Sequence, residues 1–266
     1  MAAPVLEARG VTKRYGRVQA LQGADFTAFP GEVTALIGDN GAGKSTLVKL
    51  LAGAARPDGG QITINGAVVH LTSPAEARKH GIETVYQDLA LAPDLDAAAN
   101  LHLGRELYLI RFLRVLDRRA MRERATAAFA ELGIELPDVR APVAALSGGQ
   151  RQSVAVARAV AYASRIIFMD EPTAALGVIQ RARVLDTIRR VRDRGIAVVL
   201  ISHNMPEVLA IADRIQVLRL GRRVATFRAE GTTMEELVGA MTGAVTQDDV
   251  AQEALLQENG AQERQS

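Results

Sequence analysis

The segment "GDNGAGKST" (38–46) constrains the fold of this chain more than any other feature. It is preceded by "VTALI" (33–37), a continuous apolar run that predicts a strand buried on both faces. It is followed by "STLVKLLAG" (45–53), which predicts a helix. A strand, a glycine-rich loop ending in Gly-Lys-Ser and a helix, in that order, predict a phosphate-binding loop.

The loop has the residue types that hold a nucleotide phosphate. Its glycines let backbone N–H groups wrap a phosphate, and the helix N-terminus adds partial positive charge. Lys44 is expected to reach the β- and γ-phosphates, and the Ser45 hydroxyl to bind Mg²⁺. A chance glycine turn is the alternative, and the strand and helix on either side argue against it. The candidate nucleotide-binding residues are Gly38, Asp39, Asn40, Gly41, Ala42, Gly43, Lys44, Ser45 and Thr46.

Strand and helix patterns alternate along much of the chain. "RIIFMD" (165–170) and "IAVVLISH" (196–203) predict strands, with a helix over 178–195 between them. Hairpins are expected at 61–69, around Asn-Gly, and at 214–227. This order predicts an α/β fold, with a mainly parallel sheet, helices on both faces and a small antiparallel β subdomain.

Residues from about 88 to 150 change character and predict an inserted helical subdomain. Apolar positions recur at helical spacing in "LYLIRFLRVL" (107–116) and "MRERATAAFAELG" (121–133). We therefore expect one domain over 1–243, followed by a polar and loose tail over 244–266.

Composition excludes several classes of protein. The chain has 266 residues, with 32 Lys and Arg against 30 Asp and Glu, and this balance argues against a general nucleic-acid binder. It contains no cysteine, so neither disulfides nor thiolate metal sites are possible. We expect no signal peptide, because the start "MAAPVLEARG" has no basic region followed by an apolar stretch. We expect no membrane span, because no uninterrupted run of roughly 18 apolar residues occurs. If the chain works at a membrane, another chain must hold it there.

Three polar residues end predicted strands. Asp170 and Glu171 follow an apolar strand, which puts their carboxylates at the edge of the sheet where α/β proteins bind ligands. Asp170 can hold Mg²⁺ through water, and Glu171 can orient and polarise the attacking water. His203 ends another strand and can face a γ-phosphate. The alternatives are two solvated acids and a capping or packing histidine.

Other residues leave two interpretations open. Gln87 ends a strand-like run and can bind Mg²⁺ or the attacking water, or be a solvent-facing turn residue. Tyr15 can stack on an adenine or be a half-buried strand aromatic. The Arg-rich segment 105–125 can touch lipid head groups or nucleic acid, or be the solvated face of a packed helix.

A second anion-site pattern begins at "LSGGQ" (146–150), before a helical run. Together with the phosphate loop, "FMDEPT" (168–173) and "SHN" (202–204), it resembles the nucleotide-binding subunit of ABC transporters over about residues 4–242. In that family two such domains pack head to tail, and each ATP lies between the phosphate loop of one and the "LSGGQ" of the other. The resemblance implies that Ser147, Gly148, Gly149 and Gln150 act on the partner's ATP.

The resemblance also assigns roles to the ambiguous residues. Tyr15 falls at the family's adenine-stacking position, Gln87 at its Q-loop and His203 at its switch histidine. The helical insert of the family docks on a short cytoplasmic helix of the membrane subunit. ATP binding closes the dimer and hydrolysis reopens it.

A departure from the family points to a subgroup. "TAALGV" (173–178) has Gly177 where the family usually has the Asp that links the two sites. The same run occurs in bacterial ATPases that import simple sugars. The resemblance therefore implies a peripheral homodimer on the cytoplasmic face of the inner membrane, beneath two permease subunits. A periplasmic or lipid-anchored sugar-binding protein acts with them indirectly.

Three alternatives remain beside a sugar importer. The first is an ABC ATPase for another small-molecule cargo. The second is a soluble ABC ATPase acting on ribosomes or DNA, although such proteins usually carry two ATPase domains or a long coiled-coil insert. The third is a nucleotide-binding scaffold without turnover, which the presence of Glu171 and His203 disfavours.

Overall fold

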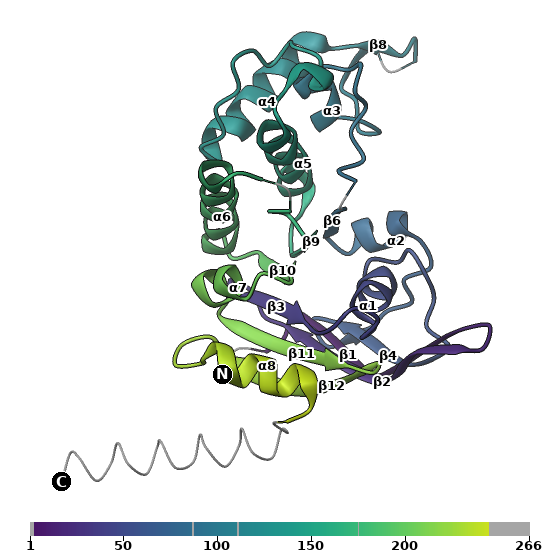
Figure 1. The fold of residues 1–266 in the computed structure, drawn as a ribbon. Coiled ribbons are helices and arrows are strands. Elements are labelled where there is room, and N and C mark those ends of the chain that lie inside the picture. Colours follow the sequence, from purple (N-terminus) through teal and green to yellow (C-terminus); the bar gives the residue numbers. More distant parts are fainter. Residues whose placement is uncertain (1–2, 87, 111, 175, 245–266) are drawn as a thin grey trace, which may run out of the picture.

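The computed structural model describes residues 3–86, 88–110, 112–174 and 176–244 (Figure 1). A six-stranded sheet in the order β12-β11-β3-β10-β9-β6 forms the centre of these residues. Its strands are Arg222–Arg228, Arg214–Arg219, Val33–Ile37, Ala197–Ile201, Ile166–Asp170 and Ile82–Val85. Every neighbouring pair is parallel except β11 and β12, so the mainly parallel α/β sheet predicted from the sequence is confirmed.

The register of this sheet brings three strand ends together. Ile201 at the end of β10 pairs with Asp170 at the end of β9 and with Leu36 near the end of β3. The residues that follow these strands therefore leave the sheet at one edge. These are the three segments in which the sequence places the phosphate loop, Glu171 and His203.

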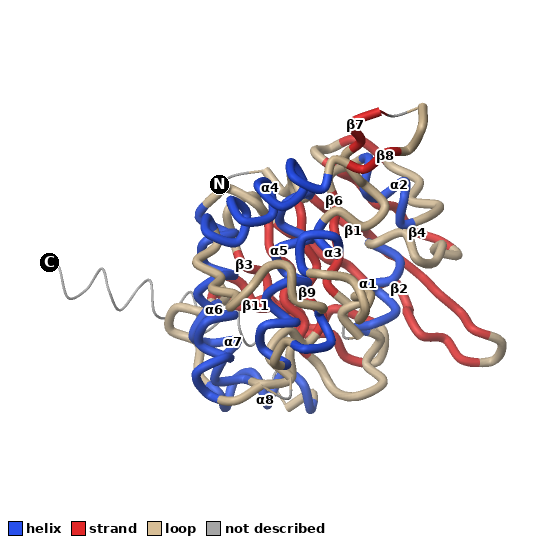
Figure 2. The backbone as a smooth tube through the Cα atoms, turned by 90° about the horizontal axis from the view of Figure 1, so that it is seen from above, coloured by secondary structure: helices blue, strands red, loops and turns tan. Residues whose placement is uncertain are grey.

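A separate antiparallel sheet has the order β2-β1-β4-β5. Its strands are Val18–Ala28, Leu6–Tyr15, Gly59–Ile64 and Ala67–Val68. The turn between β4 and β5 has Asn65 and Gly66 at positive φ, as the sequence predicted. The long β1–β2 hairpin extends beyond the helices (Figure 2).

Buried side chains divide among the faces of the central sheet. Ile167 and Met169 of β9 pack with the helices of the upper part of Figure 1, whereas Ile166 and Phe168 pack with the antiparallel sheet and α1. This alternation is why β9 is apolar at every position before Asp170. The helices α1, α2, α6, α7 and α8 span Lys44–Leu51, Pro74–Lys79, Val178–Asp193, Met205–Ile211 and Met234–Thr242. None of the described helices is both long and apolar enough to cross a bilayer.

A helical lobe lies beside the central sheet. Its elements are α3, β7, β8, α4, the 3-10 helix η1 and α5, at Ala97–Leu101, Tyr108–Ile110, Val115–Leu116, Arg118–Glu131, Val143–Ala145 and Gly148–Tyr162. The limits of the insert, about 88–150, and of the domain, 1–243, stay predictions, and the helical lobe as described includes α5 to Tyr162. Residues 245–266 of the predicted tail lie outside the described residues.

The helix predicted over 107–116 is wrong. This segment is a hairpin, in which Asp117 donates its backbone N–H to the Leu107 carbonyl at 2.8 Å. Its apolar side chains are exposed, and Phe112 is 91% exposed. A helix here would bury no apolar face against a core, and such burial is what stabilises most protein helices. The Asp117 side chain caps α4 instead, and the helix predicted over 121–133 is confirmed at Arg118–Glu131.

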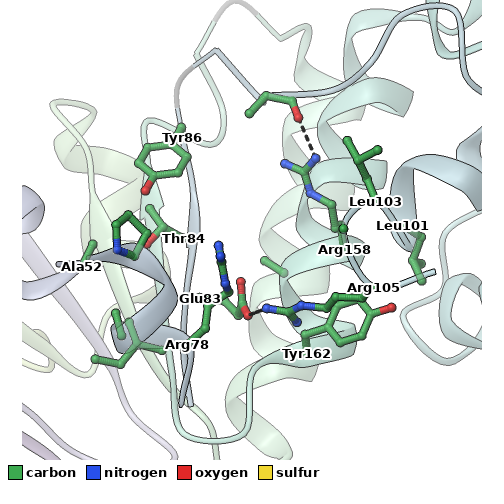
Figure 3. A pocket seen from close by; sticks show the side chains of 16 residues that line it. Ala52, Arg78, Glu83, Thr84, Tyr86, Leu101, Leu103, Arg105, Arg158 and Tyr162 are labelled. Atoms are coloured by element: carbon green, nitrogen blue, oxygen red, sulfur yellow. Dashed lines mark hydrogen bonds and ion pairs between the residues drawn. The ribbon is translucent and has the colours of Figure 1, made fainter. Parts of the chain in front are cut away.

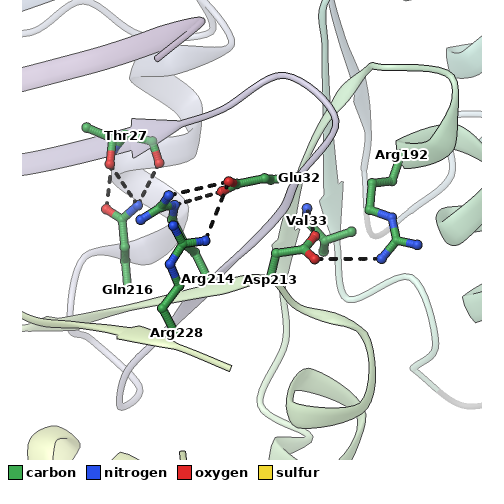
Figure 4. Close-up of polar contacts among 8 residues, drawn as sticks. All are labelled: Thr27, Glu32, Val33, Arg192, Asp213, Arg214, Gln216 and Arg228. Carbon is green, nitrogen blue, oxygen red and sulfur yellow. Dashed lines mark hydrogen bonds and ion pairs between the residues drawn. The ribbon is translucent and has the colours of Figure 1, made fainter. Parts of the chain in front are cut away.

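Ion pairs join the amino-terminal ends of the central strands (Figure 4). The Glu32 carboxylate accepts hydrogen bonds from Arg214 at 2.7 and 3.4 Å and lies 3.6 Å from Arg228. Next to Arg214, Asp213 lies 3.7 Å from Arg192 near the end of α6. These contacts hold the sheet at the edge opposite the candidate site.

The buried His102 is expected to make stability depend on pH. Its Nδ1 lies 2.7 Å from the Tyr162 hydroxyl, its Nε2 lies 3.1 Å from the Met121 carbonyl, and burial lowers its pKa. Below the ordinary histidine pKa of about 6.5, the unfolded chain therefore binds a proton that the folded chain does not. Stability from this group is present above pH 6.5 and decreases as the pH falls toward the folded pKa.

We expect urea unfolding of wild type to lose stability from this group as the pH falls from 7.5 to 5.5. This component should be absent from His102→Gln and present in His80→Gln, a partly exposed histidine. Equal pH slopes for all three proteins would contradict the assignment to His102.

Candidate nucleotide-binding and catalytic site

The loop between β3 and α1 requires glycine at two positions. A Cβ atom on Gly38 would lie 2.1 Å from the Leu218 carbonyl oxygen, and Gly38 has a φ of 148°. A Cβ atom on Gly43 would lie 2.7 Å from the Ala20 carbonyl oxygen. Gly43 is the N-cap of α1 in a left-handed conformation, so the loop turns sharply into a helix that begins at Lys44.

Lys44 lies inside this loop. Its Nζ donates hydrogen bonds to the Gly38 and Asp39 carbonyl oxygens at 2.7 and 3.0 Å. Burial lowers the pKa of Lys44, and the charges of Glu171, Asp39 and Asp170 oppose that shift. The loop and the acidic strand end therefore lie close enough to interact electrostatically.

The two acidic residues at the end of β9 differ in environment. Burial raises the pKa of Asp170, the neighbouring Glu171 charge raises it further, and Lys44 and Lys49 lower it. Glu171 has a φ of 49°, the left-handed region that few non-glycine residues adopt. Its backbone N–H donates to the Ile201 carbonyl at 2.9 Å, which fixes this turn against the end of β10. Such local strain is typical of functional positions.

Glu171 and His203 are in direct contact. The His203 Nδ1 atom lies 2.7 Å from the Glu171 Oε1 atom. The His203 side chain is 77% exposed and that of Glu171 17% exposed. The carboxylate therefore holds an imidazole that faces solvent, at the edge of the sheet where the phosphate loop begins.

Glu207 was not identified from the sequence, yet its buried carboxylate connects three segments of the site. It accepts hydrogen bonds from the Thr173 hydroxyl at 2.5 Å and the Asn204 amide at 2.8 Å, and it lies 3.0 Å from the Arg181 Nε. Thr173 follows Glu171, and Asn204 follows His203. The only sequence signal was its place as a first-turn acid of the short helix α7.

Of the two residues left ambiguous by the sequence, Tyr15 is described by the structure and Gln87 is not. Tyr15 ends β1 with 47% of its surface exposed, and the Lys13 Nζ lies 5.5 Å from the centre of its ring. The ring is thus available for stacking rather than part of the core. Gln87 lies outside the described residues. Leu89 and Ala90 follow Gln87 closely in the sequence, and their carbonyls accept hydrogen bonds from Arg158 of α5 at 2.8 and 2.6 Å.

The "LSGGQ" segment forms the N-terminus of α5. Ser147 is its N-cap, and a capping box joins it to Gln150, with Ser147 N–H to Gln150 Oε1 at 2.9 Å and Gln150 N–H to Ser147 Oγ at 3.3 Å. Ser147 and Gly148 are exposed. Within the described part of the chain, no hydrogen bond or ion pair joins this segment to the phosphate loop. The structure thus brings together the loop, Asp170, Glu171 and His203, and does not bring Ser147–Gln150 into that group.

Gln180 of α6 packs on this helix start. A Cβ atom on Gly149 would lie 2.7 Å from its Cγ and 2.8 Å from its Cβ. A Cβ atom on Gly177 would lie 2.7 Å from its Oε1. The Gln180 side chain therefore occupies the space that a residue at position 177 would use. Gly177 leaves that space to the amide.

The two neighbouring glycines are expected to differ in their tolerance of alanine. Gly149→Ala should destabilise the fold by about 1–3 kcal/mol, because the new methyl group overlaps Gln180. Gly148→Ala is the matched control, since its Cβ would meet only Leu176 Cδ2 at 3.9 Å. Denaturant unfolding of both variants measures the difference. Equal stabilities would mean that α5 and α6 separate at no cost.

The fold and the geometry of this edge define a class. A glycine loop opens a helix that begins with a lysine, and two carboxylates lie at the end of β9, a parallel strand separated from β3 by β10. This is the arrangement of P-loop nucleoside triphosphatases. Residues 21–174 match the ABC transporter family, and the chain belongs to this family as an ATP-binding protein.

Similar proteins support the same membership. The chain is 53% identical to the fructose import ATP-binding protein FrcA of Rhizobium meliloti, over 91% of this chain and 95% of that protein. It is 45% identical to the xylose/arabinose import ATP-binding protein XylG of Sulfolobus acidocaldarius, over 90% and 94%. It is 47% identical to the ribose import ATP-binding protein RbsA 1 of Rubrobacter xylanophilus. That match covers 90% of this chain and 47% of the relative.

Solved structures share the fold. A nucleotide-free ATP-binding cassette from an ABC transporter is 25% identical with a TM-score of 0.76, over 90% of this chain and 96% of that one. A dimeric cassette in a post-hydrolysis state, bound to ADP and Pi, is 25% identical with a TM-score of 0.72, over 85% and 100%.

Proposed function

We propose that this chain is the ATPase subunit of an importer that takes up a simple sugar. One observation carries the proposal: the phosphate loop, Glu171 and His203 share one edge of the sheet, as ATP hydrolysis requires. The sugar assignment is supported by the names of the relatives, which import fructose, ribose, or xylose and arabinose. Uptake of another small molecule is the alternative cargo. A soluble ATPase acting on ribosomes or DNA is disfavoured by the near-neutral net charge of +2.

The nucleotide is held by the loop and the first turn of α1. Backbone N–H groups of residues 38–46 wrap the phosphates, and the Lys44 ammonium exchanges its carbonyl partners for phosphate oxygens. Tyr15 stacks on the adenine ring with its exposed face.

The residues present suit Mg²⁺. Asp170 is a half-buried carboxylate beside a second negative charge, which a cation would stabilise, and the Ser45 hydroxyl lies exposed in the first turn of α1. The described residues contain no cluster of three or more acidic or histidine ligands. That fits Mg²⁺, which keeps several waters and binds one or two protein groups plus the phosphates. Ser45, Asp170 and Gln87 are the proposed ligands. Bound there, the ion would neutralise charge on the phosphate oxygens.

Glu171 and His203 carry out the chemistry. The Glu171 carboxylate orients the attacking water and polarises it. Because the Glu171 carboxylate accepts from His203 Nδ1–H, Nε2 is left to face the γ-phosphate, and it donates a hydrogen bond there when the ring carries both protons. Gln87 contacts the same water or the Mg²⁺ ion.

A second copy of the chain completes each site. Ser147, Gly148, Gly149 and Gln150 start a helix on another lobe, where the exposed Ser147 and Gly148 and the positive end of the helix dipole suit the γ-phosphate of a partner's ATP. A head-to-tail homodimer brings that helix start over the phosphate loop of the other copy. ATP favours the closed dimer because it contacts both halves only there.

The permease subunits dock in a groove between the lobes (Figure 3). The groove has a volume of about 280 Å³ and lies between α2, β6 and the helical lobe. Glu83 and Arg105 pair across it, and Tyr86, which directly precedes Gln87, lines it. A short permease helix in this groove would contact the segment next to the ATP site. The chain then lies peripherally on the cytoplasmic face of the inner membrane, and a periplasmic or lipid-anchored sugar-binding protein acts through the permease.

The test is ATPase activity of the chain purified with its native membrane partners, across a panel of sugars loaded on the cognate binding protein. Stimulation by one loaded form supports the importer and identifies the cargo. Activity indifferent to every sugar removes the sugar assignment. Co-purification with ribosomes or DNA in place of integral membrane proteins would overturn the transport function.

A further inference from the structure

The β7–β8 hairpin exposes six large apolar side chains. Phe112 is 91% exposed, Leu109 67% and Leu113 59%. Their neighbours Tyr108, Ile110 and Val115 are also exposed. The hairpin that carries these six residues, named the apolar tip below, projects from the helical lobe (Figure 1). Large apolar side chains gathered on one exposed hairpin are typical of an interaction site.

The charges around the apolar tip are basic. Between residues 105 and 124 the sequence has seven arginines against three acidic residues. Arg114 and Arg118 are exposed, and neither forms an ion pair with another described residue. Apolar side chains flanked by arginines are typical of segments that insert at the surface of an anionic bilayer.

The hairpin rises beside the groove of Figure 3. Leu103 and Arg105 line that groove, and the chain continues from Arg105 into β7 within three residues. Arg105 is held there by Glu83 of β6 and stacks over Tyr162, with its guanidinium 4.1 Å from the centre of the ring. If the groove docks on a permease, as proposed above, the hairpin lies on the same side as the membrane.

We infer that the apolar tip inserts into the head-group layer of an anionic bilayer. Arg114 beside Leu113 and Arg118 at the start of α4 contact lipid phosphates. This inference rests on the proposed docking of the groove. It adds a direct lipid contact that orients the ATPase on the membrane independently of the permease.

The absence of cysteine makes the test direct, because a single introduced cysteine carries the label. Full-length Leu113→Cys, labelled with an environment-sensitive fluorophore, is titrated with vesicles of phosphatidylethanolamine and phosphatidylglycerol. Val18→Cys is the matched control, since Val18 is 66% exposed on the β1–β2 hairpin. A blue shift at position 113 and none at position 18 is expected. The shift should weaken with salt and disappear in vesicles without phosphatidylglycerol.

Vesicle flotation gives the second measurement. Leu109→Ser with Phe112→Ser should lower the partition coefficient about tenfold or more, because two large apolar side chains no longer enter the bilayer. Val18→Ser should leave it unchanged. Both double-serine positions are exposed and in contact with no core cluster, so the fold is retained.

Two outcomes overturn the lipid contact. One is no shift at position 113 at millimolar anionic lipid. The other is a shift only in vesicles that contain the permease, which would make the tip a protein contact. Neither affects the proposed function, which is judged by co-purification with membrane partners and sugar-stimulated ATPase activity. Conversely, if the chain binds vesicles but does not assemble with a permease, the lipid contact is supported and the proposed importer function is contradicted.

Discussion

Glu171→Gln is expected to reduce ATP turnover by about three orders of magnitude while leaving ATP affinity nearly unchanged. The amide keeps the shape of the side chain and its contact with His203 at 2.7 Å, but it cannot accept a proton from the attacking water. With hydrolysis blocked and ATP still contacting both halves, the closed dimer should accumulate. Single-turnover phosphate release measures the first effect, and sedimentation with ATP and Mg²⁺ measures the second.

Glu230→Gln, an exposed glutamate away from the site, is the matched control for the loss of one carboxylate. Turnover near that of wild type in Glu171→Gln would remove Glu171 as the residue that activates water. A purely monomeric Glu171→Gln protein with ATP would mean that the homodimer is wrong or needs the permease subunits.

Lys44→Ala is expected to weaken ATP binding by at least about a hundredfold, because the ammonium makes charge-assisted hydrogen bonds with the phosphates. Its Nζ bonds to the Gly38 and Asp39 carbonyls in the structure. Residues 38–46 contain no other Lys or Arg, so the variant has no cation in the loop to replace it. Isothermal titration calorimetry with ATP and Mg²⁺ gives the affinity. The stability of the variant without nucleotide should change little.

Lys79→Ala is the matched control, since Lys79 is an exposed lysine of α2 that pairs with Glu76. It should bind ATP within about threefold of wild type, as expected for a screened charge at a distance. Near-normal affinity in Lys44→Ala would overturn the assignment of the phosphate loop.

The sequence by itself determined the central sheet and the phosphate loop. Both depend on local pattern: a strand that is buried on both faces is apolar at every position, and only glycine fits where Gly38 and Gly43 meet neighbouring carbonyls. The strand ends that carry Asp170, Glu171 and His203 were found for the same reason. The helix predicted over 107–116 was wrong because apolar periodicity indicates a helix only where the apolar face packs on a core. In the described residues the Phe112 side chain is 91% exposed.

Tertiary structure alone decided how these residues act together. Three arrangements join segments that are distant in sequence, so no local pattern encodes them. They are the contact between Glu171 and His203, the hydrogen bond from Thr173 to the buried Glu207, and the packing of Gln180 against Gly149. Likewise, residues 146–150 have the pattern of an anion site, but only the fold puts them on another lobe from the phosphate loop. Strand register and side-chain packing set those distances, and both arise only when the whole chain folds.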